Sequence, residues 1–340
     1  MKRNLSSSIL IKNTTNLKNN TLSLTRRQKW RFEKIQAERI ARSNKAADNS
    51  QDLDSNASAQ TGLVITRYGQ HLLVESNLGN LVQCTARRNI DLSVAGDQVI
   101  FQTTDNNKGI VTALLERDNS LKRSNKLIAA NIDELCLVVA IEPHYQFDLI
   151  DRYLIVAENQ NLPIRLIVNK IELSNNIKQV KSDFAMYEAI GYPVSYLSVR
   201  TQIGIAVLQA QLNNKTQLFL GQSGVGKSSL INQLIPELNL RVNEISTKSK
   251  LGKHTTTNTT LYHIPSGGDL IDSPGVREFH LDNLSDKEIL SGFKEFKAFV
   301  NQCKFRNCAH INEPNCAVKN ALEAGNIHPK RYASYLTLIT

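Results

Sequence analysis

The stretch GQSGVGKS, residues 221–228, decides the fold, because it matches the phosphate-loop pattern G-x-x-x-x-G-K-[S/T] in full. It follows the apolar run TQLFL and precedes KSSLINQLI, so it lies where a strand ends and a helix begins. In such a loop the backbone N–H groups surround phosphates, Lys227 reaches the outer phosphates, and the Ser228 hydroxyl binds Mg²⁺. A glycine-rich turn without a ligand is the alternative. The residues predicted to bind the nucleotide here are Gly221, Gln222, Ser223, Gly224, Val225, Gly226, Lys227, Ser228 and Ser229.

A second motif, LIVNKIEL at residues 166–173, resembles the element with which GTPases read guanine. Asn169 would hold the loop and contact the base, and Lys170 would lie along the ring. Glu172, standing where Asp is usual, would accept hydrogen bonds from the guanine N1–H and amino group. A polar loop after a strand is the alternative. Backbone N–H groups of a later loop, LSVR, would meet the guanine O6. The predicted guanine-binding residues are Asn169, Lys170, Glu172, Ser198 and Val199.

Two further segments after the phosphate loop match the switch regions of GTPases. GKHTTTNTT is polar, and Thr256 is predicted to contact Mg²⁺ and the γ-phosphate, with Thr255 as the neighbouring alternative. GGDLIDSPG places Asp272 at a strand end, where its carboxylate would hold Mg²⁺ through water. The N–H of Gly275, three residues later, would sense the γ-phosphate. Asp-Ser-Pro-Gly is also favourable turn chemistry, which is the alternative for this segment.

The order of these motifs is unusual. Asn169 lies 52 positions before Gly221, whereas the phosphate loop precedes the base motif in an ordinary GTPase. Joining the old ends of a GTPase domain and opening it after the second switch produces the order seen here. Such circular permutation is tolerated because domain termini are often close in space. The segment after the second switch then leads directly into a C-terminal domain.

The C-terminal region contains a cluster of metal-ligand residues. Cys303, Cys308, His310 and Cys316 form C-x4-C-x-H-x5-C. Three thiolates and one imidazole fill a tetrahedral zinc shell and leave no position for water, which is typical of a structural site. Ordinary reduced thiols and a surface His are the alternative.

These patterns predict a multidomain protein. Residues 1–60 form a basic, largely disordered arm and linker. Short strands in residues 61–118 predict a small antiparallel barrel of the OB type, although the pattern does not exclude an SH3-like barrel. Alternating apolar strands and amphipathic helices in residues 119–282 predict a circularly permuted α/β P-loop GTPase domain. Residues 283–340 form a helical zinc-binding domain.

The net charge of +10 is concentrated at the N-terminus, where residues 1–50 hold twelve Lys or Arg and only three acidic residues. Such an arm indicates a polyanionic partner, with RNA, DNA and anionic lipid as candidates. A solvated tail that aids solubility is the alternative. The sequence shows no apolar stretch long enough to span a bilayer and no secretory signal, so we expect a cytoplasmic protein that makes no membrane contact.

The sequence resembles the bacterial circularly permuted GTPases of small-subunit ribosome assembly, the RsgA/YjeQ family. The resemblance covers roughly residues 61–335 and rests on LIAANIDELCLVVA, DLIDRYLIVAE, NKIEL, GQSGVGKSSLIN, GKHTTT, LIDSPGVREF and CKFRNCAHINEPNC. It implies GTP or GDP with Mg²⁺, one structural Zn²⁺, and a monomer that binds the small (30S) ribosomal subunit and its rRNA late in maturation. Other assembly factors are further possible partners. Glu172 and the longer basic arm depart from the family pattern.

The resemblance also implies slow GTP hydrolysis that the ribosome accelerates. Val276 follows the second switch glycine and is apolar, so it is unable to orient water as the Gln of Ras-like enzymes does. The family carries a His at position 254, which makes His254 the candidate to position water, alongside Lys227 and Thr256 as catalytic residues. Contact with rRNA or loop stabilisation is the alternative role for His254. Two rival functions remain: an RNA-binding scaffold with GTP as a structural ligand, and an organellar form of the same enzyme.

Overall fold

The computed structural model describes residues 59–87, 90, 92–104, 107–123, 126–236, 238, 258–273 and 284–339. All of them belong to one compact unit, Ala57–Thr340. Residues 1–58 of the predicted arm and linker lie outside the described residues, as do the predicted site residues His254, Thr255, Thr256 and Gly275, whereas residues 59–60 already belong to the first strand. No described helix has the length and apolar character that a bilayer span requires.

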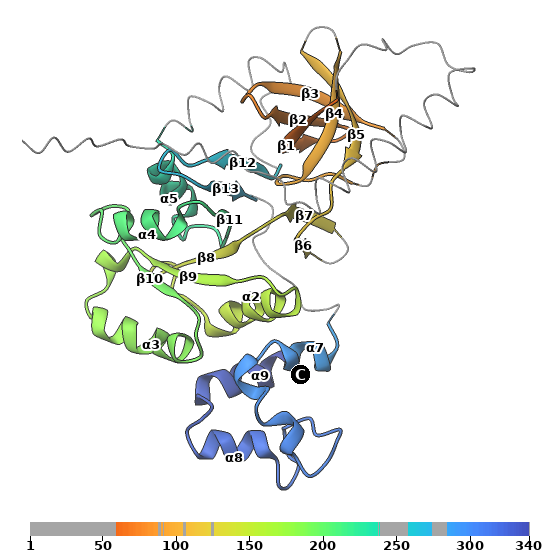
Figure 1. Cartoon of the computed structure of the whole chain (residues 1–340). Helices are drawn as coiled ribbons and strands as arrows, with labels where there is room; N and C mark the ends of the chain where they lie inside the picture. The colour runs from red at the N-terminus through yellow and green to blue at the C-terminus, as the bar shows by residue number, and fades with distance from the viewer. Residues whose placement is uncertain are drawn as a thin grey trace, which may run out of the picture. The chain divides into compact units, whose positions relative to one another are not determined.

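Five short strands close into the predicted OB-type barrel (Figure 1). The strands are β1 (Ala59–Tyr68), β2 (His71–Ser76), β3 (Leu81–Ala86), β4 (Gln98–Thr104) and β5 (Lys108–Leu114). The order β1-β2-β3-β5-β4 returns to β1, and β3 pairs with β5 in parallel while the other pairs are antiparallel. Alternate residues point inward, so that Leu72, Val74 and Cys84 are buried in the barrel core.

A hairpin that the sequence did not suggest connects the barrel to the next domain. It comprises β6 (Ser120–Arg123) and β7 (Lys126–Ala130), which pair antiparallel. These strands are short, and the sequence SLKR lacks the alternation of apolar and polar residues that identifies a strand.

The central domain is a mostly parallel sheet with helices on both faces, as predicted (Figure 1). Its order is β10-β9-β8-β11-β13-β12, and only β12 runs antiparallel to its neighbour. The strands are β8 (Glu134–Ala140), β9 (Ile164–Asn169), β10 (Val194–Tyr196), β11 (Thr216–Leu220), β12 (Thr260–His263) and β13 (Asp269–Asp272).

Four helices and one 3₁₀ turn cover this sheet: α2 (Phe147–Asn159), α3 (Ile177–Ala189), α4 (Ile205–Leu212), α5 (Lys227–Leu234) and η1 (Ile171–Leu173). The two faces of β8 belong to different cores. Leu135 and Leu137 pack with α2 and α3, whereas Cys136 and Val138 pack with α4 and α5. A strand buried on both faces explains why ELCLVVA reads as a continuous apolar run.

The C-terminal region is helical and packs on the central domain. Its elements are α7 (Asp286–Ser291), η2 (Lys294–Phe296), η3 (Val300–Gln302), α8 (Ala317–Glu323) and α9 (Pro329–Ile339). Arg331 of α9 is 1% exposed and forms ion pairs with the buried Asp151 of α2 and with Glu295. Its guanidinium also lies 4.5 Å from the ring centre of Phe293. These contacts satisfy a buried cation that would otherwise be strongly destabilising.

Candidate functional site

The phosphate loop has the predicted strand-loop-helix context. β11 ends at Leu220 and α5 begins at Lys227, so the loop presents backbone N–H groups at a helix N-terminus. Gly224 and Gly226 have φ values of 84° and 87°, in the left-handed region that favours glycine. A Cβ on Gly221 would lie 2.4 Å from the Val138 carbonyl oxygen. The loop glycines are therefore required by backbone conformation and by space.

The base-reading loop contacts the phosphate loop directly. The Asn169 side chain is buried, and its Nδ2 donates to the Val225 carbonyl oxygen at 2.9 Å. Lys170 Nζ donates to the Gly224 carbonyl oxygen at 2.7 Å and to the Glu142 carbonyl oxygen at 2.6 Å. Two motifs that the permutation reverses in the sequence thus meet in space at the carboxyl ends of β9 and β11, where open α/β sheets bind ligands.

Two buried acceptor atoms in this loop fit a guanine base. Asn169 Oδ1 and Glu172 Oε2 are buried without a hydrogen-bond partner among the described residues. An unpaired buried acceptor is destabilising, and most such atoms in folded proteins are paired. Guanine carries two N–H donors on one edge, at N1 and at the 2-amino group, and a carboxylate matches them. Glu172 therefore suits this base despite its extra methylene.

The second base loop offers one free backbone donor. Ser198 is fully buried, and its N–H donates to the Ile203 carbonyl oxygen at 3.0 Å while its Oγ accepts from Thr201 N–H. Val199 N–H has no acceptor among the described residues. Of the two predicted N–H groups, that of Val199 is the one available to the guanine O6.

Lys227 and Asp272 meet beside the phosphate loop. Lys227 Nζ lies 3.0 Å from Asp272 Oδ1, and the two side chains are 13% and 20% exposed. β13 pairs with β11 in parallel, with Asp272 opposite Phe219, so the two strand ends place these side chains together. An outer phosphate and its Mg²⁺ are the natural partners of such a cation and carboxylate. Ser228 lies one residue further, in the first turn of α5.

The loop after β8 is a part of the site that the sequence reasoning missed. Pro143 Cδ lies 3.5 Å from the position of a Cβ built on Gly224, and Lys170 holds the Glu142 carbonyl oxygen. No motif marks this loop. Its position after a central parallel strand was the available signal, since such loops line ligand sites.

The four predicted zinc ligands converge in the C-terminal region. The ligand atoms of Cys303, Cys308, His310 and Cys316 lie within 4.8 Å of one another. His310 Nδ1 is 3.5 Å from Cys303 Sγ and 3.3 Å from Cys316 Sγ. Zn–S bonds of about 2.3 Å and Zn–N bonds of about 2.0 Å in a tetrahedron imply ligand separations of about 3.5–3.8 Å, and the two distances agree with this range to within about 0.2 Å.

The surroundings of this cluster also suit a metal. Burial lowers the pKa of His310, which keeps the imidazole neutral as a metal ligand must be. Tyr332 Oη donates to the His310 carbonyl oxygen at 2.6 Å, and Ala317 N–H donates to Cys303 Sγ at 3.3 Å. Hydrogen bonds of this kind orient the ligands around a metal.

Comparisons with known proteins agree with this geometry. The RsgA GTPase family model matches residues 114–282. A protein of Marinobacter nauticus named small ribosomal subunit biogenesis GTPase RsgA is 42% identical over 328 residues, which cover 92% of this chain and 93% of that protein. A protein of the same name from Hamiltonella defensa is 45% identical over 296 residues, covering 83% and 84%.

Two solved structures resemble most of this chain. Thermotoga maritima YjeQ superposes with a TM-score of 0.70 at 30% identity, covering 83% of this chain and 98% of that one. YloQ, described as a circularly permuted GTPase, has a TM-score of 0.67 at 26% identity, covering 85% and 96%. The permuted order inferred from the motifs and the resemblance drawn from them are thereby confirmed. This chain belongs to the RsgA GTPase family.

Proposed function

We propose that this GTPase acts in late maturation of the small ribosomal subunit, binding its rRNA and hydrolysing GTP to GDP and phosphate when the subunit is bound. The proposal that the nucleotide is GTP rests on one observation. Asn169 and Lys170 donate hydrogen bonds to carbonyl oxygens of the phosphate loop, and in the same base-reading loop a Glu172 carboxylate oxygen has no partner among the described residues. The ribosomal part is supported by the relatives, which are named as small ribosomal subunit biogenesis GTPases.

In this proposal the phosphate loop and Lys227 would hold the β- and γ-phosphates, and Ser228, Thr256 and Asp272 would hold Mg²⁺. Bound there, the ion would supply positive charge against the charge that develops on the phosphate oxygens. His254 positions the attacking water, because Val276 carries no polar atom. The N–H of Gly275 senses the γ-phosphate.

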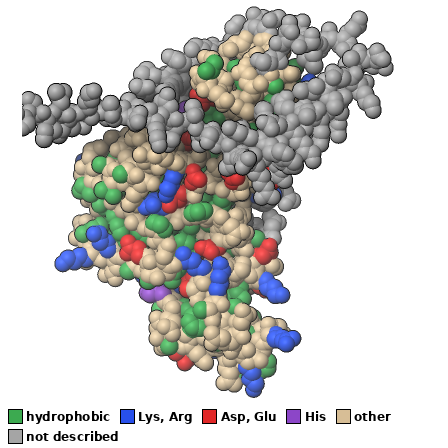
Figure 2. Space-filling view, in the orientation of Figure 1, with side chains coloured by type: hydrophobic (Ala, Val, Ile, Leu, Met, Phe, Trp, Pro, Cys, Tyr) green, Lys and Arg blue, Asp and Glu red, His purple; other side chains and the backbone are tan. Residues whose placement is uncertain are grey.

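Contact with rRNA is assigned mainly to the N-terminal arm, with contributions from the barrel and the zinc-binding domain. Residues 1–50 account for +9 of the net charge of +10, which leaves +1 for the rest of the chain. On the face shown in Figure 2, Lys and Arg side chains are interspersed with Asp and Glu rather than forming one basic surface. Subunit binding should weaken as salt rises, because phosphate contacts release counterions. We also propose that the protein acts in the cytoplasm, where it would meet its ribosomal partner, and that it acts as a monomer.

The zinc cluster is proposed to bind one structural Zn²⁺ through Cys303, Cys308, His310 and Cys316. Its ligand set leaves no open coordination position, so the ion would stabilise the fold of the C-terminal domain rather than take part in hydrolysis. The domain limits of the sequence analysis, at residues 60, 118 and 282, are part of the same proposal.

The decisive experiment is GTP turnover with and without purified small ribosomal subunits, with ATP as the nucleotide control and Lys227→Ala as the variant control. We expect strong stimulation that is specific for GTP and absent in Lys227→Ala. Binding to the subunit without stimulated turnover would instead support the scaffold function, in which GTP is a structural ligand. Equal turnover of ATP would refute the assignment of residues 169–172 to guanine recognition.

A further inference from the structure

Strand β12 joins the nucleotide site to the barrel. It begins two residues after the described chain resumes at Asn258, and so follows the segment that contains the predicted switch residue Thr256. Its inner edge pairs with β13, which ends at Asp272 beside Lys227. Its outer edge pairs with barrel strand β1 through one residue pair, Thr66 and Thr260. The barrel therefore covers the open edge of the hairpin between the two switches.

A chain of hydroxyl contacts accompanies this pairing. Thr66 is fully buried, and its Oγ1 donates to the Thr259 carbonyl oxygen at 3.0 Å and accepts from Thr260 Oγ1 at 3.2 Å. Thr259 Oγ1 lies 3.2 Å from Ser273 Oγ, next to Asp272. Hydrogen bonds have narrow limits of distance and angle, so a shift of β1 would alter these part-buried contacts as far as Ser273, where the second switch begins.

An ionic bridge reinforces the same contact at the other end of β12. His263 Nε2 lies 2.5 Å from Glu75 Oε2 of the barrel, and its Nδ1 lies 2.6 Å from Asp269 Oδ1 of β13. Hydrogen bonds to Asp269 and then Glu75 raise the pKa of His263 to about 10, although burial opposes the shift. The imidazole is therefore charged at neutral pH, and it links the barrel to both strands of the hairpin.

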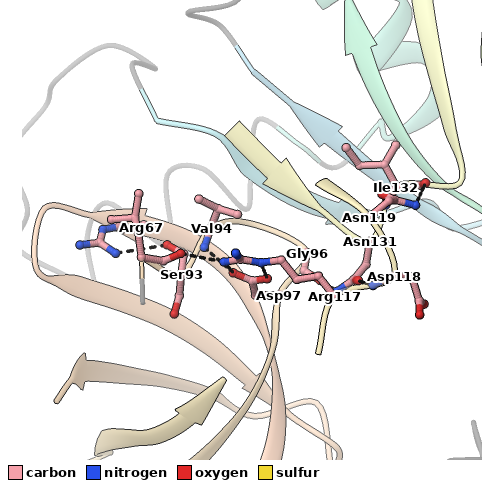
Figure 3. Close-up of polar contacts among 11 residues, drawn as sticks. Arg67, Ser93, Val94, Gly96, Asp97, Arg117, Asp118, Asn119, Asn131 and Ile132 are labelled. Carbon is pink, nitrogen blue, oxygen red and sulfur yellow. Dashed lines mark hydrogen bonds and ion pairs between the residues drawn. The ribbon is translucent and has the colours of Figure 1, made fainter. Parts of the chain in front are cut away.

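The barrel is also attached to the central domain through the chain segment that connects them, where side chains form several hydrogen bonds (Figure 3). Asp97 is fully buried, and both of its carboxylate oxygens accept from Arg117, at 2.6 and 2.8 Å. Asn119 exchanges two side-chain hydrogen bonds of 2.8 Å with the backbone of Ile132. Asn131 Nδ2 donates to the Gly96 carbonyl oxygen at 2.8 Å.

The two attachments differ in kind. The connection in Figure 3 holds backbone segments by several paired side-chain bonds, whereas the β1–β12 contact consists of one backbone residue pair, the Thr66 hydroxyl bonds and one partly exposed ionic bridge. β1 also carries a bulge between Val64 and Thr66, which interrupts its regular pairing at this point. Rotation of the barrel about the connection would therefore act first on β12.

We infer that the barrel controls GTP hydrolysis through the β1–β12 contact, with Thr66 and Glu75 acting as positioning residues for the hairpin that links the two switches. The inference deepens the proposed function and rests on it, because the signal carried is the binding of the barrel to the ribosomal subunit. Neither residue belongs to the predicted nucleotide-binding motifs. Each acts through β12, by the Thr66 hydroxyl at one end and the Glu75 carboxylate at the other.

The test compares Thr66→Val, which has the same shape without the hydroxyl, with Thr66→Ser, which keeps the hydroxyl. Glu75→Gln is the second variant, and Glu323→Gln on the exposed face of α8 is its control. For each protein, kcat and KM for GTP are measured without and with small subunits, and subunit affinity is measured separately. We expect Thr66→Val and Glu75→Gln to reduce the stimulation about fivefold or more, a typical coupling between sites. Intrinsic turnover, KM and subunit affinity should stay near wild type.

A second readout does not need the ribosome. Hydrogen exchange of the β1 and β2 amides should differ between the GDP form and a form with a non-hydrolysable GTP analogue, and Glu75→Gln should abolish the difference. Full stimulation in Thr66→Val and Glu75→Gln would overturn the inference and leave the proposed function intact. Loss in Thr66→Ser equal to that in Thr66→Val would also overturn it, because the hydroxyl would then not matter. Absence of stimulation in the wild type would overturn both.

Discussion

Replacing Glu172 by Gln tests whether this loop reads guanine. The Oε2 atom is buried and has no hydrogen-bond partner among the described residues, so it is an acceptor available to a ligand. A carboxylate accepts from both guanine donors, whereas Gln presents one oxygen and one NH₂ group. The amide nitrogen would then face an N–H donor, which removes one bond and leaves both groups unsatisfied.

The size of the loss follows from these contacts. Hydrogen bonds to charged groups contribute about 1.5–3 kcal/mol each, and an unsatisfied buried donor costs about 1–3 kcal/mol. The lower limits of these ranges add up to about 2.5 kcal/mol, so binding should weaken by roughly 60-fold or more, since 1.4 kcal/mol is a factor of ten. Glu172→Asp keeps both acceptors and should maintain or tighten binding.

Isothermal titration with GDP measures the change without hydrolysis, and XDP supplies an internal check. Xanthine has a carbonyl where guanine has its 2-amino group, so the Gln amide should donate to it and the preference for XDP should rise. Glu323→Gln, an exposed change of the same chemistry, should leave both affinities unaltered. A GDP affinity within about twofold of wild type in Glu172→Gln would refute guanine reading by this carboxylate, given the energies involved.

Three further predictions concern the phosphate loop, the zinc cluster and the ionic bridge. Gly226→Ala should weaken GTP binding about tenfold or more, because φ is 87° and the new Cβ would lie 2.4 Å from Asn169 Nδ2. Gly69→Ala, with φ of 59° and open space around the Cβ, is the matched control, and equal losses of affinity in fluorescence titration would contradict the explanation. Chelation should unfold the C-terminal domain before the rest, seen as lost helical circular dichroism with nucleotide binding retained; an unchanged spectrum would count against a structural ion. The stabilisation from His263, whose pKa is raised to about 10, should be fully present below about pH 6.5 and disappear as pH rises through 10. The difference in unfolding free energy between wild type and His263→Gln should therefore shrink over that interval, and a constant difference would disprove it.

Much of the nucleotide and zinc chemistry was predictable because each motif is short and continuous. The phosphate loop occupies eight consecutive residues, and the zinc ligands lie between Cys303 and Cys316. Local spacing sets which atoms can converge in such segments, so residue types and intervals sufficed to predict a loop at a helix N-terminus and a cluster of four possible metal ligands. The order of the motifs also revealed the permutation, and alternating apolar patterns revealed the barrel and the parallel sheet.

The tertiary structure decided the contacts between distant residues. Glu75 and His263 are 188 positions apart, and Asp151 and Arg331 are 180 apart. Charged residues are common in any sequence, so no spacing marks these pairs. Packing selected them when it paired β12 with β1, the neighbour of β2, and placed α9 on α2. Local sequence determined the residue types of each loop, whereas only folding determined which distant side chains meet, because packing brings together residues that no spacing in the sequence relates.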